Sequence, residues 1–118
     1  MSVSEPVIQS ILLGDAVEHA PVAILVADDE MRFAAANQYA CELLGYTREE
    51  LLEKRVTDIA RHPGAPDAFR QMVENGELSG STTVVRKDGT ELRMRHRSSE
   101  TRIAGLVYYV SVSWPEEG

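Results

Sequence analysis

Residues 37–51, which read NQYACELLGYTREEL, carry the strongest structural signal in this chain because they contain two helix starts and one helix stop. Asn37 is a good N-cap residue, since its side-chain oxygen can accept a hydrogen bond from a free amide of the first turn. Gly45 tolerates the positive φ angle that is common just after a helix. Thr47 and Glu50 match the capping box, in which each side chain accepts a hydrogen bond from the other's backbone amide. The segment therefore predicts two short helices in direct succession.

Strand patterns flank this segment on both sides. Before it, an apolar run turns at Asp28-Asp29-Glu30 into a second short strand. After it, Asp88-Gly89 separates two runs of alternating polarity, which is a strong hairpin signal. At the N-terminus, Ser4 is a candidate N-cap for an amphipathic helix that Gly14 interrupts. In chain order we expect this helix, strands 22–27 and 31–36, helices 38–44, 48–53, 56–60 and 67–75, and strands 81–86, 90–99 and 106–114, which is an α+β arrangement.

The length and charge of the chain limit its architecture and its partners. It has 118 residues and a formal net charge of −7, which indicates one small folded domain. We expect a single domain over 1–118, with an N-terminal cap helix (1–20), a core (21–114) and a tail (115–118). The longest apolar run, 22–27, is far shorter than the about 20 residues that a membrane span needs, and the N-terminus lacks a basic signal-peptide start. We therefore expect a cytoplasmic protein without membrane contact, and its acidic balance argues against nucleic acid as a partner.

Catalytic and metal-binding motifs are absent from the sequence. It contains no glycine-rich phosphate loop, no HExxH, no GxSxG and no cluster of His, Cys and carboxylate residues at metal-ligand spacing. Cys41 is the single cysteine, so neither an intrachain disulfide nor a CxxC metal site can form. We therefore expect neither catalysis nor a bound metal.

Four sequence segments, in this order, resemble the PAS family of sensory domains. They read EHAPVAI (18–24), NQYA (37–40), LLGYTREEL (43–51) and RKDGT (86–90), and the resemblance extends over about residues 12–112. It implies the PAS fold, which is a five-stranded antiparallel sheet with short helices on one face over a cavity and an N-terminal amphipathic helix. Family members use the cavity for haem, flavin, another chromophore or small metabolites, or fill it with side chains. The resemblance also implies a role in signal transduction, as part of a bacterial two-component system or as a one-domain sensor.

Charged residues alternate with other side chains along strand 90–99, so a single register places all the charges on one face. Met94 and His96 then face inward, toward the cavity that the resemblance implies. His96 is either a hydrogen-bonded core histidine or a polar anchor for a small ligand. The partners expected in the first case are Tyr39, Tyr109 or Ser111. Apolar walls with few polar groups fit a small apolar or weakly polar organic ligand. The candidate pocket residues are Leu25, Ala27, Tyr39, Leu43, Val56, Ile59, Phe69, Met72, Val84, Met94, His96, Tyr109 and Ser111.

Haem and flavin are not expected as cofactors. Flavin photoreceptors of the family carry a reactive cysteine after the capping-box helix, where this chain reads EKRVTD (53–58). The positions that correspond to their flavin-contacting Asn and Gln residues hold Val84, Met94 and Ser111. Haem-binding relatives supply an axial histidine from the helix before the third strand, but residues 65–77 contain none. The resemblance therefore predicts neither group in this chain.

Apolar residues occupy both faces of strand 106–114. The resemblance assigns Val107, Tyr109, Ser111 and Ser113 to the cavity side, and the opposite face then presents an apolar stripe that needs a cover. The N-terminal helix, from the same chain or from a partner, is the expected cover. We therefore predict a homodimer with the candidate interface residues Ile8, Ile11, Leu12, Leu106, Tyr108, Val110, Val112 and Trp114. The main prediction is a non-enzymatic sensor that binds a small ligand, dimerises or does both; the alternative is a homodimerisation module with a side-chain-filled core and no ligand.

Overall fold

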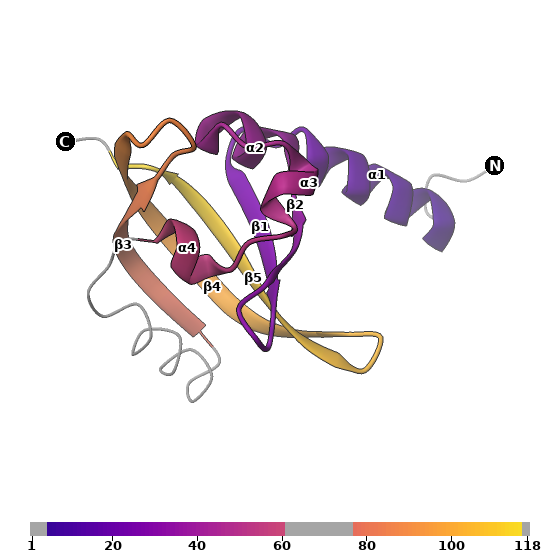
Figure 1. Cartoon of the computed structure of the whole chain (residues 1–118). Helices are drawn as coiled ribbons and strands as arrows, with labels where there is room; N and C mark the ends of the chain where they lie inside the picture. The colour runs from indigo at the N-terminus through magenta and orange to yellow at the C-terminus, as the bar shows by residue number, and fades with distance from the viewer. Residues whose placement is uncertain (1–4, 61–76, 117–118) are drawn as a thin grey trace.

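The computed structural model describes residues 5–60 and 77–116 of the chain. These residues form helices and strands in the predicted order (Figure 1). The predicted helix 67–75 lies outside the described residues. The elements are α1 (Pro6–Glu18), β1 (Ala23–Asp28), β2 (Phe33–Ala36), α2 (Gln38–Leu44), α3 (Arg48–Leu51), α4 (Val56–Ile59), β3 (Glu77–Val85), β4 (Glu91–Ile103) and β5 (Leu106–Pro115).

The five strands form one antiparallel sheet in the order β2-β1-β5-β4-β3, which confirms the predicted fold class. The short helices α2, α3 and α4 lie on one face of this sheet, which we call the inner face (Figure 1). Successive residues of a strand point to opposite faces, so the register assigns each side chain to a face. Leu25 pairs with Ser111 on the inner face, and Val26 pairs with Val110 on the outer face.

The segment 37–51 folds as its sequence predicts. Asn37 caps α2 by accepting a hydrogen bond from the Ala40 amide, and Gly45 ends the helix with a φ angle of 83°. Thr47 and Glu50 form the complete capping box at the start of α3. The helix ends at Leu51 rather than at residue 53, because the amides of Glu53 and Lys54 bond three residues back and tighten the last turn.

Alanines allow α2 to pack closely against the sheet. Ala23 of β1 is 1% exposed, and Ala40 of α2 is fully buried. Both belong to one hydrophobic cluster with Ala36, at the end of β2. A larger side chain at these positions would separate the helix from the sheet, since protein interiors are close-packed. The other members of the cluster are Phe33, Leu44, Leu51, Ile59 and Met94.

Helix α1 is present, but it differs from the predicted amphipathic helix in two respects. It begins after Glu5 and runs unbroken through Gly14, because a glycine costs a helix only about 1 kcal/mol and does not stop it as proline does. Its apolar side chains lie around the whole circumference, and none of its residues is buried. Figure 1 shows α1 projecting away from the sheet, so it does not cover the outer face of its own chain. The N-cap is Glu5, whose side chain makes no cap hydrogen bond, so the predicted cap Ser4 is wrong by one residue.

Two hairpins join the last three strands. The first turns at Asp88-Gly89, as predicted, with a φ angle of 88° at the glycine. The second turns at Ala104-Gly105, and both residues have positive φ angles, 52° and 81°. The pairing of β4 with β5 continues to Ile103 and Leu106, beyond the ends of the neighbouring strands, so this hairpin projects from the sheet (Figure 1). Of the helices described, none has the length and hydropathy to cross a bilayer.

Candidate functional site

The structure brings many of the predicted pocket residues into one place. Leu25, Tyr39, Leu43, Val56, Ile59, Val84 and Met94 all belong to, or pack against, the hydrophobic cluster under the short helices. Ala27, His96, Tyr109 and Ser111 lie on the same inner face by strand register. Phe69 and Met72 lie outside the described residues. The inner face is therefore an apolar surface of the kind predicted, while its role as a ligand pocket stays a prediction.

His96 is half-buried on the inner face, on the side of β4 opposite to the arginines. Its register neighbours are Ser113 of β5 and Gly80 of β3. Ser111, one of the three expected partners, lies opposite Ser98. The alternation of charges predicted the face correctly, and the hydrogen-bond partner of His96 stays a prediction.

Three hydroxyl-bearing residues of the inner face are buried. Ser98 is 9% exposed, Ser113 is 6% exposed and Tyr109 is 5% exposed. Burial raises the pKa of the Tyr109 hydroxyl, and the nearby carboxylates Glu100 and Asp29 raise it further. Ser113 lies on the face to which the resemblance assigns it, although it was not among the candidate pocket residues, and its burial depends on the pairing of β5 with both β1 and β4.

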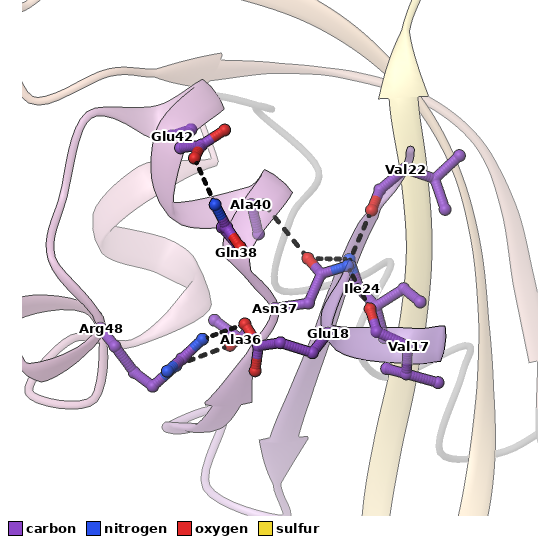
Figure 2. A network of polar contacts seen from close by, with 10 residues as sticks. All are labelled: Val17, Glu18, Val22, Ile24, Ala36, Asn37, Gln38, Ala40, Glu42 and Arg48. Atoms are coloured by element: carbon purple, nitrogen blue, oxygen red, sulfur yellow. Dashed lines mark hydrogen bonds and ion pairs between the residues drawn. The ribbon is translucent and has the colours of Figure 1, made fainter. Parts of the chain in front are cut away.

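Asn37 is the centre of a buried hydrogen-bond network at the junction of α1, β1 and α2 (Figure 2). Its side chain is 4% exposed. Its Oδ1 atom accepts hydrogen bonds from the amides of Ile24, at 3.0 Å, and Ala40, at 3.1 Å. Its Nδ2 atom donates to the carbonyls of Val17, at 2.8 Å, and Val22, at 2.9 Å. The sequence predicted the cap bond alone, because the other three partners come from segments 13 to 20 residues away.

Arg48 makes a second connection at the same junction. Its Nε atom donates to the carbonyl of Ala36, at 3.0 Å, and its Nη2 atom forms an ion pair with Glu18 at the end of α1 (Figure 2). Nothing in the sequence pattern singled out Arg48, since the capping box that it follows is satisfied without it. The junction is thus held by one buried amide and one exposed guanidinium.

An ion pair joins Glu50 of α3 to Lys87, which lies between β3 and β4. The Lys87 Nζ atom lies 2.7 Å from the Glu50 carboxylate. The hydrogen bond from Lys87, and then that from the Thr47 amide, lowers the pKa of Glu50 to about 2. Beside this contact, between the end of α2 and the β3–β4 hairpin, lies an open pocket of about 300 Å³. It shares only Leu43 with the predicted pocket residues.

The outer face carries an apolar stripe, as predicted from β5. We define the outer stripe as Ile24 and Val26 of β1 with Tyr108, Val110, Val112 and Trp114 of β5, which share this face by register. The arginines of β4 border it, since Arg95 lies opposite Trp114 and Arg97 opposite Val112. None of the described helices covers the stripe, and the predicted α1 residues Ile11 and Leu12 are 58% and 52% exposed. Ile8 of α1 is half-buried, and Leu106, at the hairpin tip, is 61% exposed.

Glu116 joins the last three strands on the outer face. Its carboxylate accepts hydrogen bonds from the Ser81 hydroxyl, at 3.0 Å, and from Arg93 Nε, at 3.3 Å. Arg95 lies 3.8 Å from the same carboxylate. The Ser81 hydrogen bond and then that of Arg93 lower the pKa of Glu116. One carboxylate thus compensates two of the arginines beside the outer stripe.

Metal binding finds no support within residues 5–60 and 77–116, where no group of three or more His, Cys, Asp or Glu side chains converges. Cys41 is half-buried, and burial raises the pKa of its thiol.

Comparisons with known proteins agree with this architecture. A family model described as a PAS domain matches residues 21–111. A PAS domain from a two-component sensor histidine kinase has a TM-score of 0.84 at 14% identity, over 95% of this chain and 100% of that chain. The PAS domain of an HTR-like protein from Haloarcula marismortui has a TM-score of 0.82 at 21% identity, over 92% of each chain. A domain of a sensory box sensor histidine kinase/response regulator from Geobacter sulfurreducens has a TM-score of 0.80 at 22% identity, over 95% and 98% of the two chains.

No curated protein matches this chain. At the identities of the solved structures, the similarity shows a shared fold alone. The family model, by contrast, extends from Pro21, two residues before β1, into β5 and includes the whole helical segment with Asn37 at its start. The chain therefore belongs to the PAS domain family.

Proposed function

We propose that this PAS domain is a non-enzymatic signal-transduction module of the cytoplasm that works as a homodimer. The observation that carries the proposal is the combination of the uncovered outer stripe with the unburied apolar side chains of α1. A helix that is apolar on all sides is normally buried, and an apolar sheet face of this extent normally has a cover. A second copy of the chain supplies both surfaces at once.

Charge complementarity supports the same partner. The described part of the chain before β1 contains the acids Glu5, Asp15 and Glu18 and no Lys or Arg. The outer stripe is bordered by Arg95 and Arg97. A helix α1 from a second copy therefore brings negative charge to the arginine border while its apolar side chains cover the stripe. Opposite charges at the edge of an interface favour one arrangement of the partners over others.

The oligomeric state of Val112→Asp tests the dimer. A carboxylate in the middle of the outer stripe must be desolvated when the stripe is covered, so we expect the variant to sediment as a monomer where the parent sediments as a dimer. Thr57→Asp, an exposed position on α4 at the other face, is the matched control and should remain dimeric. A parent that is monomeric at all concentrations, or a dimer that tolerates Val112→Asp, contradicts the proposal.

We propose ligand binding at the inner face as a second function. It is favoured by the buried residues Ser98, Ser113 and Tyr109, which share the inner face with His96 and with the apolar side chains of the cluster. Few polar groups on apolar walls are typical of sites for small organic molecules. The ligand class that fits is apolar or weakly polar.

Native and denaturing mass spectra of the purified protein test this second function. A mass that is present in the native spectrum and lost on denaturation identifies a ligand, and His96→Ala should reduce its occupancy while the fold persists. Ser99→Ala, on the outer face of the same strand, is the control and should retain the ligand. Unchanged occupancy in His96→Ala refutes the role of the imidazole as an anchor. A clean protein mass supports the alternative of an interaction module whose core is filled by side chains.

A further inference from the structure

Helix α1 is attached to the rest of the described chain at its C-terminal end. Two side-chain contacts reach it there: the hydrogen bond from Asn37 to the Val17 carbonyl and the ion pair of Arg48 with Glu18 (Figure 2). Toward the other end, Val7 is 69% exposed and Leu13 is 64% exposed. The helix therefore extends from the domain as an arm with one fixed end (Figure 1).

The contact with Asn37 acts as the fixed end. Both hydrogens of its Nδ2 atom are used, one by Val17 and one by Val22, and its Oδ1 atom accepts two amides. Moving Val17 away would leave a buried donor without a partner, which costs about 1–3 kcal/mol. The position of the last turn of α1 is therefore set by a contact that resists opening.

The contact with Arg48 is of a different kind. The side chains of Arg48 and Glu18 are 44% and 36% exposed, so water competes for both charges. Exposed ion pairs of this type are weak and screened by salt. The pair is therefore a contact that can open while the Asn37 contact stays closed. Because Glu18 is the last residue of α1, this contact sets the angle at which the helix leaves the junction.

Arg48 also connects this angle to the sheet. Its Nε atom is bonded to the carbonyl of Ala36, the last residue of β2, while its Nη2 atom holds Glu18. The guanidinium group is planar and presents its donors in a rigid fork, so a shift of Ala36 is transmitted to Glu18. Lysine, with one ammonium group, cannot bridge the two acceptors with the same geometry.

We propose that the Glu18–Arg48 ion pair can open and close and thereby sets the direction of α1 about a pivot at Val17. Movement at the end of β2 then changes the position of the N-terminal end of the helix. The coupling between β2 and α1 depends only on the contacts of Asn37 and Arg48 at the junction. The use of this coupling in signalling rests on the proposed function, because a change in the direction of α1 then changes whether its apolar surface can contact a second copy.

Pulsed electron spin resonance measures this coupling directly. Spin labels at Ser10→Cys on α1 and Glu91→Cys on β4, in a Cys41→Ser background, report the distance from the arm to the sheet. Dilution with excess unlabelled protein restricts the signal to distances within one chain. Parent protein should give one narrow distance distribution. Glu18→Gln and Arg48→Lys should both broaden it, with the population of displaced helix rising about two- to fivefold, as the strength of an exposed ion pair allows.

Glu30→Gln is the matched control because it removes an exposed ion pair with Arg32, 3.5 Å long, in the β1–β2 turn. It should leave the distance distribution unchanged. Circular dichroism of each variant confirms that the fold is retained. A parent distribution as broad as that of Glu18→Gln, or variants identical to the parent, overturns the proposal.

Sedimentation of the same samples separates this inference from the proposed dimer. A monomer whose label-to-label distances respond to Glu18→Gln contradicts the dimer and supports the role of the ion pair. A dimer whose label-to-label distances are unchanged by both Glu18→Gln and Arg48→Lys supports the proposed dimer and contradicts the role of the ion pair.

Discussion

At the scale of single residues, Asn37 does more than any other side chain in the described structure to hold different segments together. It forms four side-chain hydrogen bonds, which reach α1, the residue just before β1, β1 itself and α2. Its own amide also bonds the carbonyl of Ile24, at 3.0 Å. A side chain that satisfies so many backbone groups cannot be replaced without leaving some of them buried and unpaired.

Asn37→Ala should therefore lower the free energy of unfolding by about 3 kcal/mol, the sum of a lost N-cap and newly unsatisfied backbone groups. Urea denaturation followed by circular dichroism measures the loss. Gln38→Ala is the control, since Gln38 is exposed and bonds only to Glu42 on its own helix among the contacts drawn in Figure 2. The importance of the network would be refuted by equal stabilities of the two variants.

Ala104 is strained, because it occupies the left-handed region with a φ angle of 52° in a tight hairpin. An alanine costs about 1 kcal/mol there, whereas Gly, which has no Cβ atom, and Asn, whose short polar side chain can hydrogen-bond locally, are favoured at both central positions of such a turn. Ala104→Asn should stabilise the protein by about 1 kcal/mol, seen as a higher Tm in a thermal scan. A lower Tm would show that the turn is not held in this conformation in solution.

At the scale of elements, α3 and the β3–β4 hairpin are coupled by the Glu50–Lys87 ion pair. The folded state lowers the pKa of Glu50 from 4.5 to about 2. The carboxylate therefore contributes stability that is fully present above pH 4.5 and is lost as the pH falls toward 2. Hydrogen bonds and cations likewise lower the pKa values of Asp88 and Glu116, so they add to the loss in acid.

Glu50→Gln should reduce the dependence of Tm on pH between about 4.5 and 2 while it lowers Tm at neutral pH. Thermal scans across this pH range measure both effects. Glu49→Gln, on the same helix, is the control and should keep the slope of the parent. A variant that loses Tm as steeply as the parent over the window would contradict the assignment of this contribution to Glu50.

At the scale of the whole molecule, the chain consists of a packed sheet-and-helix body and one helix that stands apart from it. The body contains all the buried apolar residues of the described chain, and α1 contributes none of them. The buried residues that stabilise the fold and the exposed apolar residues of α1 therefore lie in different parts of the described chain. This division is what the proposed dimer requires, since an apolar arm that is folded against its own body would have nothing to offer a partner.

Removal of residues 1–16 should leave a folded body, because α1 buries nothing in it and both Val17 and Glu18 remain. The truncated protein should keep the cooperative thermal transition of the parent and sediment as a monomer. Loss of the transition would show that α1 is part of the folding unit. A truncated protein that still dimerises would place the interface on the outer stripe alone.

The sequence by itself determined the local elements of this protein. Caps, turn residues and strand periodicity act within a few residues, so Asn37, Gly45, the Thr47–Glu50 capping box and the Asp88-Gly89 turn were predicted at the positions where the structure has them. The alternation in β4 also predicted which side chains face inward. The resemblance to the PAS family was recognised from these same local signals, because they occur together in the order that this fold requires.

Only the tertiary structure decided which distant groups meet. The three additional partners of Asn37, the bridge that Arg48 forms from Ala36 to Glu18, and the burial of Ser113 all depend on contacts between segments far apart in the chain. The exposure of α1 is decided in the same way, since its seven apolar residues, Val7, Ile8, Ile11, Leu12, Leu13, Ala16 and Val17, fit a buried helix equally well. Local rules specify how a segment folds, but packing alone specifies what it touches.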